Sequence, residues 1–574
     1  MYGRTCAYRT KIRLKQLLST SASTSKSTRS RIAIGGSKLS QNQQDGLYPS
    51  IIATSLQNSI TTFESGLNGD EKLTRGYVDA AMFLKNVHNQ EISSIGENQS
   101  EIVELTGRFG YRTSDESGKR IHGDIMQESS ENGSTVFHNL STSYVEEVLD
   151  KSPLVGLYQG KMNVDTTTIT MEEEKILKEM KQNLNLTYMA HNPEAQGSEM
   201  HVQNAPLEDI RQYTKEKMTE AFIGLERGVV EGQITSYGVC SNGLGLPSSH
   251  PLHLSWEDML QAASDAAKLV HSGSGIGEDG NVVANLSVVQ LPINLLERHG
   301  LKVANRIKNY LSSTREERGD GESSSSLKTK LLLPSSIRVF AMRPLTCYPD
   351  RGTGTGHPFK LVDYLIPHNK DMTNDGSNNG KMWTHQIDTS SPQYYTTILN
   401  ETMAHFDATP ILETKEEEER ELTTEERETI DGCKLLQSMI HDLDSNLSSG
   451  EIRSFAAYEE ELYTKVVPLI HDTFEELDPD SAELLQNFFQ AHGNAVRHSI
   501  ARTTRKLLKE GGDGVLKYDI RDDLSLQEFA LEYLWKQTCD GDHAKGSPLI
   551  DKVVIGCPKA EHVIEAVKIA DKVD

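Results

Sequence analysis

The sequence lacks long apolar segments, closely spaced cysteines and an excess of positive charge. No apolar run approaches the roughly 18 residues that a membrane-spanning helix needs, which argues against a helical membrane protein. Six cysteines in 574 residues are few and lack the spacing of metal ligands, so free thiols in a reducing compartment are expected. The net charge of -24 argues against nucleic acid or an anionic membrane as a partner, because both would repel the chain.

Glycine-rich nucleotide-binding motifs are missing as well. There is no Walker motif, and the stretch Gly273-Ser-Gly-Ile-Gly277 precedes no clear helix, so it is better interpreted as a loop. The histidines have no metal-ligand spacing, and the acidic run at 413–429 lacks the order of an EF-hand. The sequence therefore predicts no metal site and no Rossmann domain.

Acidic residues are absent from the first 44 positions. This segment carries nine lysines and arginines together with many serines and threonines. Such a composition is typical of an organelle transit peptide, so residues 1–30 are expected to address the protein to the mitochondrion, or alternatively to the chloroplast. The other interpretation is a disordered basic tail on a cytoplasmic protein.

The rest of the chain alternates between short apolar segments and amphipathic helical patterns. Eight segments have the length and composition of buried strands. These are residues 31–36, 60–66, 101–109, 186–191, 233–242, 287–293, 336–345 and 552–556. Alternation of this kind predicts parallel strands with right-handed crossovers, and eight such units close into a barrel. We therefore predict an α/β fold, a (β/α)8 TIM barrel.

A long segment interrupts this alternation after the seventh strand. Residues 346–520 show no strand pattern and combine an acidic, partly disordered run with long amphipathic helical patterns. We expect a mostly helical insertion between the seventh strand and its helix, with the barrel divided into 31–345 and 521–574. The insertion would lie on the active-site face, and it is a possible surface for a protein partner. A shorter polar segment, 113–139, is expected to be a loop.

Five stretches resemble the aldo/keto reductase family in the family's own order. They are Tyr188-Met-Ala-His191-Asn-Pro-Glu194, Leu225–Asn242, Val288–Leu296, Val339–Leu345 and Val553–Ala566. The resemblance covers roughly residues 31–345 and 522–573 and leaves out 346–520. It implies an oxidoreductase that moves a hydride between NADP or NAD and a small-molecule carbonyl or alcohol substrate.

The resemblance assigns catalytic positions to three residues. His191 occupies the place of the histidine that orients the carbonyl, Glu64 that of a strand-end carboxylate, and Arg108 that of a lysine. The family's proton-donating tyrosine has no counterpart, because Leu67-Asn68-Gly69 stands where it is expected. The site is therefore non-standard.

Three other tyrosines lie near predicted strand ends. They are Tyr111, Tyr188 and Tyr237. Tyr188 precedes His191 by three positions on one strand, so the two side chains should point to opposite faces. Tyr111 lies just past Arg108 and is the better candidate for the missing proton donor.

Eight residues fall where the family holds its cofactor. They are Ser241, Asn242, Gln290, Arg343, Gly556, Lys559, His562 and Glu565. The first three match amide-binding positions and Arg343 a pyrophosphate contact, while Gly556 and Lys559 open a helix whose N-terminus can hold a phosphate. His562 replaces the arginine that binds the 2'-phosphate, so the choice between NADP and NAD stays open.

Two further hypotheses compete with the oxidoreductase. A barrel without its tyrosine can be a catalytically inactive binding or regulatory subunit. Alternatively, the insertion supplies its own catalytic acid, for instance His441 or Tyr458.

Overall fold

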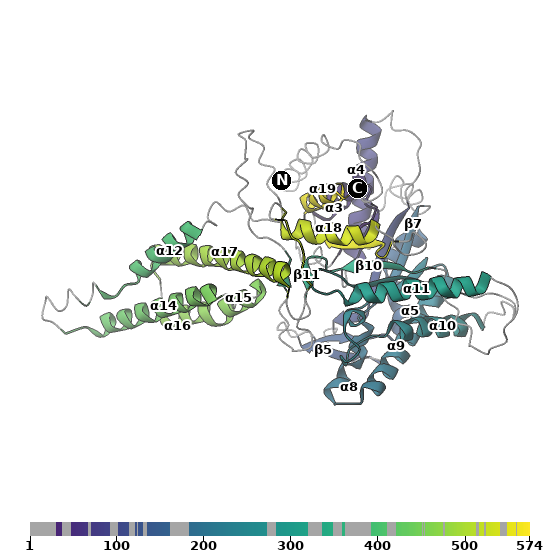
Figure 1. The fold of residues 1–574 in the computed structure, drawn as a ribbon, viewed down its shortest axis with the longest axis horizontal. Coiled ribbons are helices and arrows are strands. Elements are labelled where there is room, and N and C mark those ends of the chain that lie inside the picture. The colour runs from purple at the N-terminus through teal and green to yellow at the C-terminus, as the bar shows by residue number, and fades with distance from the viewer. Residues whose placement is uncertain are drawn as a thin grey trace. The chain divides into compact units, whose positions relative to one another are not determined.

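The protein divides into two compact units, which Figure 1 shows in a computed structural model. Unit 1 comprises Met1–Pro344 and Leu531–Asp574, and unit 2 comprises Leu345–Ala530. The structure describes residues 30–36, 47–66, 70–91, 102–113, 121–122, 124–129, 135–160, 183–272, 283–319, 336–347, 359–361, 392–409, 412, 421–449, 452, 454–474, 477–511, 516–521, 524–539, 548–557 and 559–573. The predicted transit peptide, the tripeptide Leu67-Asn68-Gly69 and most of the acidic run at 413–429 lie outside these residues.

Unit 1 is built on a closed barrel of eight parallel strands in the order β1-β13-β10-β9-β8-β7-β3-β2. The strands are β1 (Ile32–Gly35), β2 (Thr62–Glu64), β3 (Val103–Phe109), β7 (Leu184–His191), β8 (Ser236–Cys240), β9 (Leu286–Pro292), β10 (Arg338–Met342) and β13 (Lys552–Gly556). Each of them falls within or overlaps one of the eight predicted segments. The prediction of a TIM barrel is confirmed.

Helices and helical turns connect the strands. They are α3 (Leu47–Gln57), α4 (Asp70–Glu91), α5 (Thr142–Lys151), α6 (Pro153–Gln159), η1 (Pro193–Gly197), α8 (Ser198–Val202), α9 (Leu207–Val230), η2 (Gly243–Gly245), α10 (Trp256–Ser272), α11 (His299–Gly319), α18 (Leu526–Cys539) and α19 (Ala560–Ala570). Helix α9 buries Met218, Phe222 and Leu225 completely, as its apolar stripe predicts. Among the described residues, no helix has both the length and the hydropathy to cross a membrane.

An apolar cluster fills the middle of the barrel. Its members are Ala33, Met189, Cys240, Val288, Phe340, Met342 and Val554, which come from six strands. Because side chains alternate along each strand, these inward positions lie between an amino-terminal layer and a carboxyl-terminal layer of the same strands.

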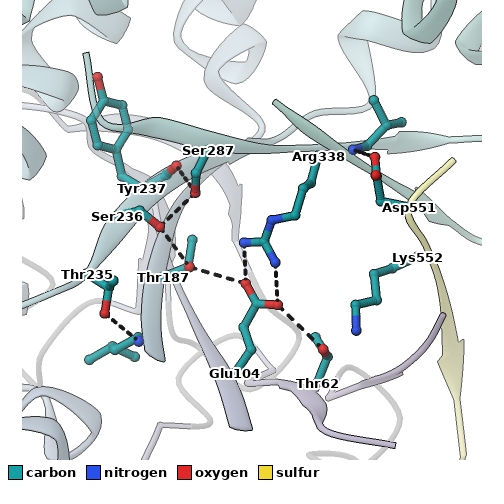
Figure 2. A network of polar contacts seen from close by, with 12 residues as sticks. Thr62, Glu104, Thr187, Thr235, Ser236, Tyr237, Ser287, Arg338, Asp551 and Lys552 are labelled. Carbon is teal, nitrogen blue, oxygen red and sulfur yellow. Dashed lines mark hydrogen bonds and ion pairs between the residues drawn. The ribbon is translucent and has the colours of Figure 1, made fainter. Parts of the chain in front are cut away.

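The amino-terminal layer is polar, which is unusual for the interior of such a barrel (Figure 2). Arg338 donates two hydrogen bonds to the Glu104 carboxylate, at 2.8 and 2.6 Å. The hydroxyls of Thr62 and Thr187 donate to the same carboxylate at 3.5 and 3.4 Å, and Thr187 in turn contacts Ser236 at 3.1 Å. This layer closes the barrel at the ends where the strands begin, so a ligand in the barrel is expected at the opposite mouth.

The segment predicted to be a loop instead contains a three-stranded antiparallel sheet. Its strands are β4 (Tyr111–Thr113), β5 (Ile125–Ser129) and β6 (Thr135–His138), in the order β4-β6-β5. Asp124 forms an ion pair with Arg112 and accepts hydrogen bonds from the Ile121 amide at 2.6 Å and from Asn139 Nδ2 at 3.1 Å. Side-chain pairing of this kind helps to hold strands as short as these in place. The sheet begins directly after β3 and therefore fixes Tyr111 near the barrel mouth.

Unit 2 is mainly helical; in the sequence it begins after β10 and ends within the first turns of α18. Its helices are α12 (Pro392–His405), α14 (Thr424–Ser449), α15 (Phe455–Glu461), the π-helix η4 (Leu462–Val466), α16 (Val467–Thr473) and α17 (Pro479–Glu510). A short antiparallel pair, β11 (Thr346–Cys347) with β12 (Phe359–Lys360), was not predicted.

A buried histidine occupies the core of unit 2. His492 is fully buried, and its ring stacks on Phe488 at a centroid distance of 5.7 Å. Nε2 lies 3.1 Å from the Leu443 carbonyl oxygen, which can only accept, so Nε2 carries the proton. Nδ1 then accepts from the Tyr458 hydroxyl at 2.9 Å. Burial lowers the pKa of His492 to about 4, so the ring is neutral near pH 7.

We expect His492 to make unit 2 sensitive to acid. The unfolded chain binds a proton at this histidine below its ordinary pKa of 6.5, whereas the folded chain does so only below about 4. The free energy of unfolding of unit 2 is therefore unaffected by this histidine above pH 6.5. It falls by about 3 kcal/mol as the pH drops from 6.5 towards 4. Hydrogen exchange of α17 at several pH values measures the opening free energy in the full chain.

The matched variants are His492→Phe and His441→Gln. His492→Phe should flatten the pH dependence of α17 opening, whereas the exposed His441 on α14 should leave it as in the wild type. Equal pH slopes for the wild type and His492→Phe would contradict the assignment.

Candidate functional site

Polar side chains from three strands meet at the carboxyl-terminal mouth of the barrel. Glu64 is the last residue of β2, Arg108 is next to last on β3, and Gln290 lies near the end of β9. Arg108 Nη2 forms an ion pair with Glu64 Oε2 and donates a second hydrogen bond to Gln290 Oε1 at 3.2 Å. The side chains of Arg108 and Glu64 are 9% and 0% exposed. The structure thus brings two predicted catalytic residues and one predicted cofactor ligand into direct contact.

Several polar atoms of this cluster have no partner within the described part of the chain. They are Glu64 Oε1, Arg108 Nε and Gln290 Nε2, and each is buried. Buried polar groups in proteins are nearly always hydrogen-bonded, so a group of unpaired ones calls for a ligand or ordered water. Burial also raises the pKa of Glu64, while the charge of Arg108 opposes the rise.

His191 ends β7 at the same mouth and is held in its neutral form. Burial, then the positive charge of Arg108, then His138 lower the pKa of His191 well below its usual range. Its Nδ1 atom is buried without a partner among the residues described. The backbone oxygen of His191 accepts a hydrogen bond from His138 Nε2 at 2.8 Å. His191 is therefore held in place through its backbone, and its ring can form a hydrogen bond with a ligand.

Tyr111 is the tyrosine that contacts His191. Its ring packs edge-on against His191 and His138, with centroid distances of 5.4 and 4.7 Å. Asn192 Nδ2 donates a hydrogen bond to the Tyr111 hydroxyl oxygen at 3.1 Å. A phenol can donate its own proton as well as accept a hydrogen bond. Tyr111 thus combines an acidic group with a place beside a predicted catalytic residue.

The two other candidate tyrosines face away from the barrel interior. The Tyr188 hydroxyl binds Asp70 and Ser152, and its ring lies so close to Gly107 that a Cβ there would be 2.4 Å from it. Tyr237 donates to Glu226 at 2.8 Å. The prediction that Tyr188 points away from His191 is confirmed.

A buried carboxylate organises the turn after β8. Glu194 accepts hydrogen bonds from Ser241 Oγ and from the Gly243 amide, both at 2.8 Å. The Asn242 side chain donates to Asn192 Oδ1 at 3.0 Å, with Asn192 in the left-handed region at φ 49°. A cofactor contact to the Ser241 hydroxyl would compete with Glu194, so Gln290 is the stronger amide-binding candidate.

The remaining cofactor candidates lie at the exits of β10 and β13. Arg343, directly after β10, has φ 56° and donates to Glu297 Oε1 at 2.8 Å. Gly556 ends β13, and the exposed Lys559 is the N-cap residue of α19. His562 and Glu565 are half-buried on α19, within its first two turns. The exits of β10 and β13 lie side by side at the mouth of the barrel, because these two strands pair in parallel.

Three contributors to the mouth were not found from sequence. His138, Asn192 and Glu194 hold the ends of β7 and β8 in place. Asn192 and Glu194 lie within three residues of His191 in the sequence, so their proximity was a usable signal, whereas His138 comes from the unpredicted sheet. Among the described residues, no group of three or more His, Cys, Asp or Glu could hold a metal ion.

The two acids suggested in unit 2 have different surroundings. Tyr458 is buried and donates its hydroxyl proton to His492, so it contributes to the core of that unit. His441 is exposed on α14.

A comparison with protein-family models gives no match for this chain, and a comparison with curated proteins gives none either.

Proposed function

We propose that the protein is an oxidoreductase of aldo/keto reductase type that acts on a carbonyl or alcohol with NADP or NAD. The observation that carries the proposal is the buried cluster of Glu64, Arg108 and Gln290, with neutral His191 at the same mouth. Barrel enzymes of this kind hold their reacting groups at the carboxyl ends of the strands. The ordered sequence resemblance to the reductase family supports the same class.

The residues at the mouth fit a nicotinamide cofactor in part. Gln290 Nε2 is a buried amide donor that forms no hydrogen bond of normal geometry in the described chain, although the Glu64 carboxyl lies near it, and such a donor suits the oxygen of a carboxamide. Lys559 at the start of α19 suits a phosphate, because a helix N-terminus favours negative charge. The bound cofactor would supply or accept the hydride.

The chain's own groups would handle the oxygen of the substrate. Arg108 carries a permanent positive charge, and neutral His191 can donate a hydrogen bond, so the two can stabilise an oxygen on which negative charge develops. Glu64 would hold Arg108 in place. Tyr111 would donate the proton, taking the role of the tyrosine that is missing at residues 67–69.

A cofactor titration tests the proposal. NADPH and NADH should quench the protein fluorescence, and Gln290→Leu should raise the Kd about tenfold, since one hydrogen bond to a buried group contributes about 1.4 kcal/mol. Gln233→Leu is the matched control and should leave the Kd unchanged, because Gln233 is a partly exposed residue that precedes β8 and so lies at the other end of the barrel.

The alternative is a catalytically inactive barrel with a binding or regulatory role. It is favoured by the absence of a tyrosine at residues 67–69, since the Glu64–Arg108 pair could then serve stability alone. Absence of quenching by either cofactor at millimolar concentration, together with no turnover of simple aldehydes, would establish this alternative over the oxidoreductase.

A further inference from the structure

A pocket lined mostly by polar residues lies on the outside of the barrel, between α9, α10 and α11. Its volume is about 530 Å³. Its lining includes the cationic or aromatic side chains of Arg211, Lys215, His253, Trp256, His299 and Arg306. The pocket does not include Glu64, Arg108, His191 or Gln290, so it is separate from the mouth cluster.

Two residues that line this pocket each carry a buried donor atom with no acceptor within the described ranges. These atoms are Arg211 Nε and Trp256 Nε1. Arg211 is held by its other nitrogen, Nη2, which donates to the Ser248 backbone oxygen. An indole and a guanidinium nitrogen can only donate, so a ligand that satisfies both must present acceptor atoms.

Carboxylates also line the pocket, but two of the three have internal partners. Asp258 Oδ1 lies 3.6 Å from Lys215 Nζ, and Glu257 accepts from Ser255 Oγ at 2.9 Å. Glu208 is the third. The guanidinium groups of Arg211 and Arg306 are therefore the strongest candidates for binding an anion.

Two helices begin at this pocket. Helix α10 starts at Trp256, where Ser255 Oγ accepts from the Asp258 amide at 3.2 Å, and α11 starts at His299. Each helix N-terminus adds partial positive charge. Burial, then His253, Lys302 and Arg306 lower the pKa of His299. The pocket thus has unsatisfied donors, cationic side chains and two helix N-termini on one concave surface.

We propose that this pocket binds an organic phosphate. Arg211 and Arg306 would hold the phosphate, and the Trp256 ring would pack against the organic part while its N–H donates. The pocket is within the size range of small-metabolite sites and much larger than a free phosphate ion requires. This binding does not require the oxidoreductase activity, and it can be measured without any nicotinamide cofactor.

Calorimetric titration of the full chain tests the proposal with glucose 6-phosphate and adenosine 5'-monophosphate as probes. Inorganic phosphate and glucose serve as comparators for the anion and the organic part alone. At least one organic phosphate should bind with a Kd below millimolar, and more tightly than either comparator. Arg306→Gln should weaken that binding at least tenfold, as should Trp256→Phe, which removes the indole donor.

Arg227→Gln is the matched control, because Arg227 lies on the same helix α9 in an exposed pair with Glu146. It should bind the probes as the wild type does, and so should Gln290→Leu, whose change is confined to the barrel mouth. The proposal is overturned if neither organic phosphate binds, if glucose or inorganic phosphate binds equally well, or if Arg306→Gln retains wild-type affinity. Failure of NADPH binding would leave these titrations unaffected, so the two proposals fail independently.

Discussion

Glu64→Leu should reduce the free energy of unfolding of the barrel by about 3–5 kcal/mol. The substitution leaves the Arg108 guanidinium buried at 9% exposure without its carboxylate partner. Arginine cannot lose its proton to escape this cost. Gln290 still accepts one hydrogen bond from Arg108, but an amide oxygen does not neutralise the charge.

Removing the other partner should cost less, and the cost should depend on pH. In Arg108→Met the Glu64 carboxyl can take up a proton, because burial already raises its pKa and the opposing charge is gone. A carboxyl whose folded pKa lies above its unfolded value stabilises the fold at low pH, and that stabilisation is lost as the pH rises. Arg108→Met should therefore be more stable relative to the wild type at pH 5 than at pH 8.

Urea unfolding of the single and double variants measures both effects. The double variant Glu64→Leu with Arg108→Met should recover much of the stability lost by Glu64→Leu, because no buried charge then remains. Glu146→Leu is the matched control: its pair with Arg227 is about half exposed, and its loss should change stability by about 1 kcal/mol or less. A double variant that is no more stable than Glu64→Leu would show that the unpaired charge of Arg108 is not the main cause of the instability of Glu64→Leu.

Tyr111→Phe should lower kcat of the proposed reductase by about 100-fold or more, the usual contribution of a positioned general acid. The ring contacts with His191 and His138 would remain, and only the hydroxyl that accepts from Asn192 would be lost. KM and cofactor affinity should change little. A loss confined to kcat separates a proton donor from a residue that merely shapes the mouth.

Steady-state kinetics with NADPH and an aldehyde measures this effect. Tyr213→Phe, on the outer helix α9, should retain wild-type kcat. Tyr188→Phe should instead lower stability, since its hydroxyl lies among Asp70 and Ser152 on the outer side of β7. If Tyr111→Phe kept kcat within about threefold of the wild type, the proton would have to come from another group.

The barrel and part of its mouth could be predicted from sequence because the signals are local. Each strand is a short apolar run, and parallel pairing brings all carboxyl ends to one rim. Glu64 and His191 end their strands and Arg108 nearly does, so their convergence follows from topology alone. Gln290 reaches Arg108 because strands on opposite sides of the barrel point their side chains to the same interior.

The supporting contacts depend on pairings that carry no local signal. The sheet containing His138 is built from strands of three to five residues without a regular apolar alternation, and its ion pair joins Arg112 to Asp124 across a stretch that resembles a loop. The outer pocket likewise needs the first turns of α9 beside the N-termini of α10 and α11. Such arrangements depend on tertiary packing, which sequence periodicity does not encode.

The closure of the barrel has a consequence for synthesis. Strand β1 pairs with β13, the last strand of the chain, so neither β1 nor β10 has its full set of neighbours until β13 is made. Translation of Leu345–Ala530 comes first and takes roughly 10–40 s at ordinary elongation rates. During that interval the free edges of β1 and β10 stay unpaired on the nascent chain, and unpaired strand edges promote aggregation. Unit 2 has its own core and can fold in that time, while the nascent barrel is the part that chaperones would need to protect.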